Sequence, residues 1–504
     1  MKILLIGLED SPSLSIPLLQ ETLGEKGFDC DFLHLPLEKD ISNSKLNEVV
    51  LQIKNNFNDI ELIGISLMTN TFHIFKKLSL KMKDWGIPIV AGGIHPTVEP
   101  EECLKYSDYA CVAEGEVPLV ELAKRIESRE RTNNISGIYS KDVNNKIIKN
   151  KLAGCVGDLS SLPAPKINLE KMFFFYGNKI RKLSLNKNLI KEYYKKYYYI
   201  LTSRGCPYRC KYCLNDSLIN IDPGFAKLRK RNTKHIIEEL KNVKNVLPKG
   251  IIIGFVEDDF CAKPTQELKE FCEIYKKEIG LPFFCASTPT SINDEKVRYL
   301  ISAGMVRLEI GIQSISDKVN KEIFGRFASK KNSIDATKML EKYRNDVQLC
   351  YDFILDNPWE EENTKIETLR FIMSLKKPVT ISLFSLTLYP GTSLFDRAMK
   401  EGIIKDVYSD VYNKNHMLLE NDAVGTLYVL YTKYLFPKSI INFLIKSLKF
   451  SFISGPLKKS TFFLWRIYNY YIGLLHSVQR KDRVSRNYYL TAPIKKIFKL
   501  FRIF

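Results

Sequence analysis

The sequence predicts an α/β protein in three parts: an N-terminal doubly wound domain, a partial (β/α)6 barrel and a mainly helical, basic C-terminal region. Short apolar runs alternate with helix-periodic stretches near the N-terminus and again from about residue 199 to 400. Such alternation is typical of parallel sheets covered by helices. The charge is unevenly spread, because residues 425–504 carry 15 Lys and Arg and a single acidic residue, Asp482. We place the domains at 1–135, 199–400 and 401–504, with a linker over 136–198.

The N-terminal domain is predicted from five apolar segments and the helical patterns between them. Residues 15–27, 45–57 and 71–86 have helix-period apolar positions, and two of these stretches close on a glycine near the expected C-cap. A parallel sheet of this kind places its ligand loops after the carboxyl ends of the strands. The strand segments are 2–8, 29–35, 61–67, 87–93 and 108–114.

The barrel is predicted from six further strand segments with helical stretches between them. In such a fold the chemistry gathers at the carboxyl ends of the strands. The segments are 198–203, 250–259, 282–288, 306–314, 347–355 and 380–388.

The cysteines are expected to be reduced thiols or metal ligands. The apolar run that begins "MKILLIGLEDS" is too short and badly flanked for a signal peptide, so we expect a cytoplasmic protein. In a reducing compartment, closely spaced cysteines indicate a metal or catalytic site and not disulfides.

Three of the 11 cysteines fall within eight positions of "SRGCPYRCKYC", at Cys206, Cys210 and Cys213. They follow the first barrel strand, where the fold would place an active site. A structural zinc ion would need a fourth ligand and usually a second paired motif, which the sequence lacks. Three cysteines on a four-iron cluster leave one iron free to bind another molecule, although such clusters usually have four cysteines.

This spacing resembles the signature of the radical S-adenosylmethionine superfamily, C-x3-C-x-aromatic-C, with Tyr212 at the aromatic position. The resemblance covers about residues 199–400 and implies a TIM-like barrel that holds a [4Fe-4S] cluster on the three cysteines. It also implies that S-adenosylmethionine binds the open iron and is cleaved to a 5′-deoxyadenosyl radical. An electron donor such as flavodoxin or ferredoxin would then be a partner.

The same resemblance assigns contacts with S-adenosylmethionine along the barrel. "FVEDDF" would bring polar groups near the methionine end, "RLEIGIQS" would contact the ribose and carboxylate, and "LYPGTSLF" resembles the turn after the sixth strand. Asp258 and Asp259 have an alternative interpretation as helix caps, whereas Glu309 within an apolar strand would be costly to bury without a partner. The implied contacts are Tyr212, Asp258, Asp259, Glu309, Gln313 and Ser314.

The N-terminal domain resembles the Rossmann-like cobalamin-binding domain that precedes many of these enzymes. The resemblance lies in "GISLMT", "GGIHPTVEPEE" and "AEGEVPLVEL", in which Ala113 stands where glycine is frequent. Glycines after a parallel strand let a loop pass close to a ligand. The implied cobalamin contacts are Ser66, Thr69, Gly92, Gly93, His95, Thr97, Glu114, Gly115 and Glu116.

No histidine is expected to ligate cobalt from below. The D-x-H-x-x-G motif is absent, "DFLH" at 31–34 has the wrong spacing, and Pro96 next to His95 favours a turn. The lower face of cobalt would then be left to water or to nothing. A relic of the domain that no longer binds cobalamin is the alternative.

The resemblance implies methylation of an unactivated carbon or phosphorus, because a carbon without an acidic proton offers a general base nothing to abstract. Within the enzymes, the alternative is a cyclase or rearrangement enzyme in which cobalamin is not the methyl donor. A methylthiotransferase fits poorly, because the front domain lacks a second cysteine cluster. A third alternative is a non-catalytic, metal-loaded protein at a membrane.

The basic C-terminal region is expected either to contact a membrane surface or to pack on the barrel. Charged residues interrupt every apolar run before it reaches the ~18 residues of a spanning helix. The last segment, "APIKKIFKLFRIF", would form an amphipathic helix suited to a membrane interface. We therefore expect a hydrophobic substrate, either a small molecule or a lipid. We expect no nucleic acid as partner, because no binding module accompanies the charge.

Overall fold

The computed structural model describes residues 1–433 and 435–460. These residues divide into two compact units. The first unit holds Met1–Gly311, Asn320–Cys350 and Thr387–Lys414, and the second holds Ile312–Val319, Tyr351–Leu386 and the chain from Asn415 onward. The first unit contains the whole first sheet, the first three barrel strands and the cysteine loop, so most of the candidate site belongs to it.

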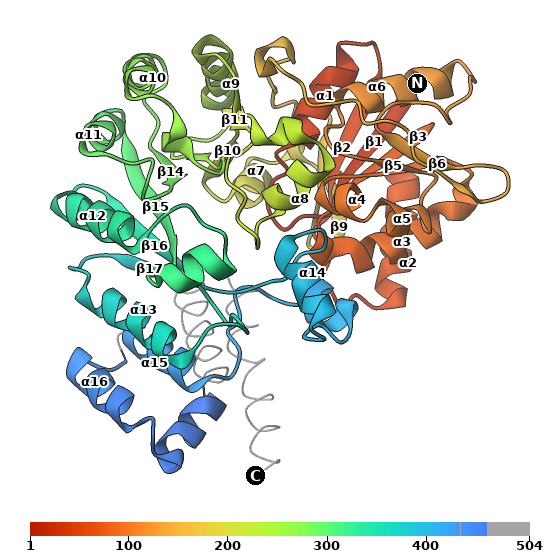
Figure 1. The fold of residues 1–504 in the computed structure, drawn as a ribbon. Helices are drawn as coiled ribbons and strands as arrows, with labels where there is room; N and C mark the ends of the chain where they lie inside the picture. The colour runs from red at the N-terminus through yellow and green to blue at the C-terminus, as the bar shows by residue number, and fades with distance from the viewer. Residues whose placement is uncertain (434, 461–504) are drawn as a thin grey trace. The chain divides into compact units, whose positions relative to one another are not determined.

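The first sheet is the predicted doubly wound sheet, drawn in red and orange in Figure 1. Its strand order is β7-β6-β5-β4-β3-β1-β2-β8-β9, and the pairs from β5 to β8 are parallel. The order reverses between β1 and β3, which is the point where ligands bind in such folds. All five predicted strands are confirmed: β1 Lys2–Gly7, β2 Asp29–His34, β3 Leu62–Ser66, β4 Ile89–Gly92 and β5 Tyr109–Cys111.

Local sequence signals explain where the helices around this sheet begin and end. Ser42 accepts a hydrogen bond from the Lys45 amide at the start of α2. Gly86 ends the turn after α3 with a φ of 68°, as the glycine pattern predicted. The helices are α1 Ile16–Gly24, α2 Asn43–Asn56, α3 Phe72–Met82, α4 Ile94–Val98, α5 Pro100–Leu104 and α6 Glu116–Glu127.

The segment 136–198 is more than the linker that we predicted. It adds two antiparallel pairs to the first sheet, β6–β7 beyond β5 and β8–β9 beyond β2. These strands are short and were not recognised because they lack a long apolar run. They are β6 Ile138–Lys141, β7 Ile147–Ile148, β8 Met172–Tyr176 and β9 Lys179–Lys182, followed by α7 Lys187–Tyr194.

The second sheet confirms the six predicted barrel strands, in the order β10-β13-β14-β15-β16-β17. The pairs β10–β13, β13–β14 and β14–β15 are parallel. In Figure 1 the helices α9 to α12 run along one side of the strands of the first unit. The strands are β10 Tyr197–Ile200, β13 Ile252–Phe255, β14 Phe283–Ser287, β15 Met305–Gln313, β16 Gln348–Leu355 and β17 Thr380–Ser385.

Asparagine caps start two of these outer helices. Asn232 accepts a hydrogen bond from the His235 amide, and Asn293 accepts one from the Lys296 amide. The helices of the first unit in this region are α8 Leu214–Ile221, α9 Thr233–Val246, α10 Thr265–Glu278, α11 Asp294–Ser302, α12 Lys330–Leu340 and α14 Ser393–Lys400.

One row of side chains crosses four strands of the barrel on the same face. Tyr199 pairs with Gly254, Gly254 with Phe284, and Phe284 with Arg307. The Arg307 guanidinium lies 4.1 Å from the centre of the Phe284 ring. A side chain at Gly254 would meet both aromatic rings, at 2.6 Å from Phe284 and 2.8 Å from Tyr199. Glycine at this position therefore lets the two rings pack inside the barrel.

The second unit contains α13 Glu362–Ser374, α15 Ala423–Thr432 and α16 Lys438–Ser447. Helix α15 is almost entirely buried, and the Tyr428 hydroxyl donates a hydrogen bond to the Lys365 carbonyl on α13 (2.6 Å). Within residues 1–433 and 435–460, no single helix is long and apolar enough to cross a membrane, although the bent pair Lys438–Ser447 and Ser451–Ser460 passes by length and composition together. The predicted terminal amphipathic helix lies outside the described residues.

Candidate active site

The cysteine loop leaves the carboxyl end of β10 through a two-stranded ribbon. Strand β11, Ser203–Arg204, pairs antiparallel with β12, Arg229–Lys230. The next residue, Gly205, has a φ of +89°, and a Cβ there would lie 2.2 Å from the Lys227 carbonyl oxygen. The Cys206 amide then donates a hydrogen bond to the Phe225 carbonyl (3.0 Å). The start of the loop is thus fixed by the ribbon.

Cys206, Cys210 and Cys213 lie close enough for their thiols to influence one another. Burial, followed by the charge of Asp258 and with smaller effects of Cys213 and Cys210, raises the pKa of Cys206 to about 12. Burial also raises the pKa of Cys213 to about 12. Within the described residues, no group of three or more Cys, His, Asp or Glu side chains forms a ready metal site. Their role as cluster ligands stays a prediction.

Arg326, which the sequence analysis did not identify, holds the aromatic residue of the motif. Its Nη1 donates to the Tyr212 hydroxyl (2.7 Å), and its Nη2 donates to the Gly311 carbonyl on β15 (2.6 Å). The Arg326 side chain is buried, and its charge lowers the pKa of Cys210 against the larger effect of burial. Arg326 therefore ties the cysteine loop to a barrel strand and supplies a cation beside a thiol.

The two neighbouring aspartates after β13 have different surroundings. Asp258 is exposed on the wall of a cavity, yet desolvation by the surrounding protein raises its pKa, with a hydrogen bond from Asn215 acting the other way. Asp259 is buried and accepts hydrogen bonds from Ser287, Thr288 and Ser291 at 3.0, 2.9 and 2.5 Å. Its carboxylate does not cap the following helix. Only Asp258 faces open space.

Glu309 is not the buried carboxylate that the apolar strand suggested. Leu308 and Ile310 are fully buried on one face of β15, whereas the Glu309 side chain, on the other face, is 29 % exposed. Its Oε1 lies 2.8 Å from Nη2 of Arg307, two residues earlier on the same face. The strand alternates, so the carboxylate has both a partner and access to solvent.

Gln313 and Ser314, in the second unit, also differ from each other. Gln313 has a φ of +67°, a conformation that costs a residue with a side chain about 1–2 kcal/mol. Its buried Oε1 has no hydrogen-bond partner. Strain together with an unsatisfied acceptor is a feature of binding sites. Ser314 is buried, and its hydroxyl lies 3.2 Å from the Thr368 hydroxyl.

One cavity of about 390 Å³ brings together predicted residues from the two domains. The first sheet contributes the carboxyl ends of β3, β4 and β5 and the loop before α6. The barrel contributes the ribbon before the cysteines, the start of α8 and the loop after β13. The predicted residues that line it are Ser66, Gly92, Gly93, Glu114, Gly115, Glu116 and Asp258.

The glycine loop of the first sheet forms a cradle that a side chain would fill. A Cβ on Gly92 would stand in open space, with no atom within 4 Å, on the wall of the cavity. Gly93 has a φ of +100° and packs so closely on the end of β3 that a Cβ there would lie 2.8 Å from the Leu67 carbonyl oxygen. Ser66, beside it, donates a hydrogen bond to the Glu9 carboxylate (2.9 Å). A large flat ligand can approach this backbone closely, and the residues therefore fit cobalamin.

Three other predicted cobalamin contacts do not line this cavity. His95 is fully buried between the rings of Phe72 and Tyr412, at centroid distances of 4.5 and 5.3 Å, and its Nδ1 lies 3.3 Å from the Thr69 hydroxyl. Burial lowers the pKa of His95 to about 4. Thr97 supports the loop instead, because its hydroxyl donates to the Gly93 carbonyl (2.8 Å) and accepts from the Ala113 amide (3.1 Å).

Glu114 and Glu116 are held by arginines of the barrel. Arg204 lies 3.2 Å from Glu114 and 2.6 Å from Glu116, and Arg229 lies 2.8 Å from Glu114. Both carboxylates are buried, with side chains that are 7 % and 5 % exposed. Sequence reasoning missed both arginines, although Arg204 directly precedes the cysteine motif.

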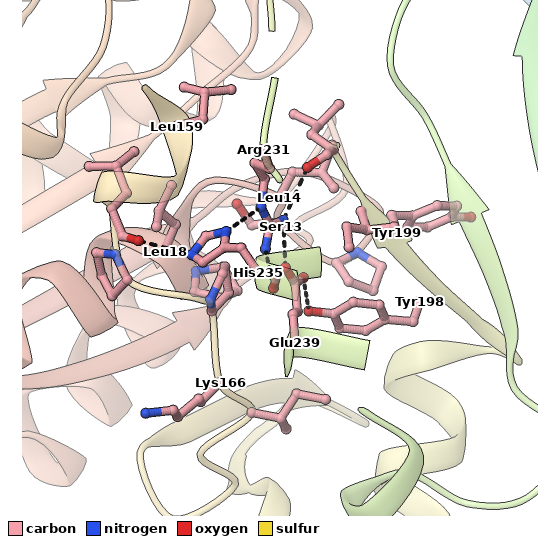
Figure 2. Close-up of a pocket in the computed structure, with 18 of the residues that line it drawn as sticks. Ser13, Leu14, Leu18, Leu159, Lys166, Tyr198, Tyr199, Arg231, His235 and Glu239 are labelled. Carbon is pink, nitrogen blue, oxygen red and sulfur yellow. Dashed lines mark hydrogen bonds and ion pairs between the residues drawn. The ribbon is translucent and has the colours of Figure 1, made fainter. Parts of the chain in front are cut away.

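A second pocket adjoins this region and shares Leu14, Leu201 and Arg204 with the larger cavity. Figure 2 shows its polar side, where Arg231, His235, Glu239 and Tyr198 point toward one another. Arg231 lies 2.6 Å from Glu239 and donates from Nε to Nδ1 of His235 (2.8 Å), and the Tyr198 hydroxyl donates to Glu239 (2.8 Å). These groups satisfy one another, so the pocket is a packed polar contact between β10 and α9.

Two protein-family models match the chain. The B12 binding domain model matches residues 7–123, and the radical SAM superfamily model matches residues 200–372. The first match covers the doubly wound sheet with its glycine loops, and the second covers the cysteine loop and most of the barrel strands.

Curated relatives are distant but extensive. An uncharacterized methyltransferase, PH0819, from Pyrococcus horikoshii is 21% identical over 73% of this chain and 74% of its own. An anaerobic magnesium-protoporphyrin IX monomethyl ester cyclase from Synechocystis is 23% identical over 71% and 68%. A bacteriochlorophyllide d C-8(2)-methyltransferase from Chlorobaculum tepidum is 22% identical over 74% and 76%.

Solved structures share the fold. The radical S-adenosylmethionine methyltransferase TsrM from Kitasatospora setae, with cobalamin and a [4Fe-4S] cluster bound, superposes with a TM-score of 0.62 at 18% identity, covering 79% of this chain and 78% of its own. The cobalamin-dependent S-adenosylmethionine radical enzyme OxsB, with aqua-cobalamin bound, gives 0.63 at 18% identity over 96% and 76%. At this identity the likeness concerns the fold alone.

The two matched domains agree with the sequence prediction of fold and of cofactors. Their cofactors are a [4Fe-4S] cluster and S-adenosylmethionine for the barrel and cobalamin for the doubly wound domain. The chain is an enzyme of the radical S-adenosylmethionine superfamily and belongs to the group whose members carry an N-terminal B12-binding domain.

Proposed function

We propose that this enzyme transfers a methyl group from S-adenosylmethionine, by way of cobalamin, to an unactivated carbon or phosphorus atom of its substrate. The observation that carries the proposal is the shared cavity, lined both by the glycine loop of the B12-binding domain and by Arg204, Gly205 and Asn215 next to the cysteines. A substrate in this cavity would lie near both the S-adenosylmethionine bound at the cluster, which generates the radical, and the cobalamin, which donates the methyl group.

The bound cofactors would supply a radical and a methyl group, and the protein residues would orient them. Cys206, Cys210 and Cys213 would hold the cluster after losing their protons, because a thiolate is the ligand form. Asp258, oriented by Asn215, faces the cavity as an acceptor for the amino end of S-adenosylmethionine. Gly92, where a Cβ would meet no atom within 4 Å, would leave open space at the cavity for the corrin ring.

Product analysis tests this proposal without knowledge of the substrate. Anoxically reconstituted enzyme, with hydroxocobalamin and flavodoxin or ferredoxin as electron donor, is incubated with S-adenosylmethionine and a cell extract. Methyl transfer predicts that both S-adenosylhomocysteine and 5′-deoxyadenosine form, and that deuterium from a labelled methyl group enters a product. 5′-Deoxyadenosine alone would contradict methyl transfer.

Formation of 5′-deoxyadenosine without S-adenosylhomocysteine would favour a cyclase or rearrangement reaction. One of the curated relatives is a cyclase, and its similarity to this chain is as extensive as that of the methyltransferases. The Cys210→Ala variant is the control for both reactions, since loss of one ligand should abolish formation of 5′-deoxyadenosine in either case.

We infer a hydrophobic substrate taken from a membrane surface, because the end of the described chain combines exposed apolar side chains with an excess of positively charged residues. On α16, Ile440 and Phe443 are 41 % and 64 % exposed and lie three residues apart, on one side of the helix. Phe452 is 74 % exposed. Residues 423–460 contain six lysines and no acidic residue. Apolar side chains beside lysines suit an anionic lipid surface.

Flotation with phosphatidylglycerol vesicles tests this contact. The full-length enzyme should float with the vesicles at low salt and lose binding in the Phe443→Glu/Phe452→Glu variant. Val143→Glu is the matched control, because Val143 is 99 % exposed on the B12-binding domain. Binding that is equal for the wild-type and double-variant enzymes would contradict a membrane role for these side chains.

A further inference from the structure

Two arginines face each other across the ribbon that leads into the cysteine loop. Arg204 on β11 and Arg229 on β12 are register partners. Like charges directly opposite each other in an antiparallel pair repel, and an anion between them offsets this repulsion. That anion is Glu114, which lies 3.2 Å from Arg204 and 2.8 Å from Arg229. The anion comes from the other domain.

The contact is buried and has two further attachments. Arg204 also binds Glu116 at 2.6 Å, and Glu114 accepts a hydrogen bond from the Val156 amide at 2.8 Å. The side chains of Glu114, Glu116 and Arg229 are at most 7 % exposed. Removing one partner from a buried ion pair leaves an uncompensated charge and is strongly destabilising locally. Movement of one loop relative to the other would therefore break this buried contact.

Both ends of this contact adjoin a cofactor position. On one side, Arg204 is followed by Gly205, whose backbone packs against the Lys227 carbonyl, and then by Cys206. On the other side, Glu114 and Glu116 flank Gly115 in the loop that lines the cavity next to Gly92 and Gly93. A displacement of the ribbon at Arg204 would therefore reach Cys206 two residues later, and a displacement of the loop at Glu114 would reach the cavity wall at Gly115.

We propose that Arg204 is a positioning residue that couples occupation of the cobalamin site to the geometry of the cysteine loop. The inference rests on the presence of both cofactors and not on methyl transfer. If the loops are coupled, cobalamin binds more tightly when the cluster is in place, and the cluster loop is better ordered when cobalamin is bound, because coupling between two sites is reciprocal.

The coupling is measured as a ratio of two dissociation constants. Hydroxocobalamin is titrated, by absorbance, into full-length protein with the reconstituted cluster and into the same protein after iron is chelated. We expect affinity in the wild-type protein to be about tenfold higher with the cluster, within the usual range of coupling. In Arg204→Lys, which keeps the charge and loses the two-pronged contact, and in Glu116→Gln, the ratio should fall to about one.

Two controls separate coupling from damage to the fold. Glu121→Gln breaks an exposed ion pair with Arg125 on α6 of the same domain, and should leave the ratio unchanged. A second measurement does not depend on the variants: in the wild-type protein, amide hydrogen exchange at residues 203–206 should slow when cobalamin is added. Equal cobalamin affinity with and without the cluster, or an unchanged ratio in both variants, would overturn the proposal.

Discussion

Ala113 lies in the loop before α6 with a φ of +72°, a conformation that normally selects glycine. Its amide is held there by the Thr97 hydroxyl. We expect Ala113→Gly to raise the free energy of unfolding by about 0.5–1 kcal/mol, since the strain relieved exceeds the added freedom of the unfolded chain. Urea unfolding checks this. Ala123→Gly, inside α6, should instead destabilise the protein by about 1 kcal/mol or more.

Glu360, in the second unit, is a partly buried acid whose pKa is raised to about 7 by desolvation. Because the folded pKa exceeds the usual 4.5, the stability it contributes is complete below pH 4.5 and is lost as pH rises through 7. Glu360→Gln should therefore stabilise the protein above pH 7, by at most about 3 kcal/mol. Thermal melts at pH 6 and pH 8.5 check this, with the exposed Glu362→Gln as control. An equal gain at both values would contradict the assignment.

At the scale of single residues, the sequence identified the site residues that stand in short motifs. The cysteine triplet and the glycine pair Gly92-Gly93 stand in contiguous motifs, and Asp258 directly follows a strand. Arg326 and Arg229 could not be found this way, because each reaches its partner through the fold from more than 100 positions away. Nor could sequence periodicity show that His95 points into an aromatic cluster.

At the scale of elements, Gly254 on β13 decides how the barrel is filled. A Cβ there would lie 2.6 Å from the Phe284 ring and 2.8 Å from the Tyr199 ring, and these rings are already packed against Tyr197 and Arg307. Gly254→Val should lower the free energy of unfolding by about 1–3 kcal/mol through overpacking. Gly157→Val, where nothing lies within 4 Å of a Cβ, should be nearly neutral by comparison.

The strands and helices that the sequence predicted are those with a strong period. The long barrel strand β15 alternates apolar and polar residues. In the first sheet, β1, β3, β4 and β5 are mostly continuous apolar runs, which suits burial on both faces. Strands β6 to β9 have two to five residues each, too few to show a period. Their pairing depends on the edge that the folded sheet offers, which is a property of the tertiary structure.

At the scale of the whole molecule, buried histidines make the B12-binding domain sensitive to acid. Burial lowers the pKa of His34 to about 3 and that of His95 to about 4, so both are neutral in the folded protein. Because these pKa values are depressed, the associated stability is present above pH 6.5 and is lost as pH falls toward 4. A urea series from pH 7.5 to 5 should show this loss. His34→Phe should make the free energy of unfolding depend less steeply on pH. An unchanged pH dependence in this variant would contradict a role of His34.

The short antiparallel strands at the margins of the first sheet also bear on solubility. Beyond β2 and β5 the sheet would otherwise present open backbone edges, which invite pairing with other chains. Strands β8–β9 and β6–β7 cover them, and β9 carries Lys179, Arg181 and Lys182, charges that discourage a further strand. A fragment that ends at residue 135 would therefore aggregate when expressed, whereas one that extends to residue 194 would keep both margins protected.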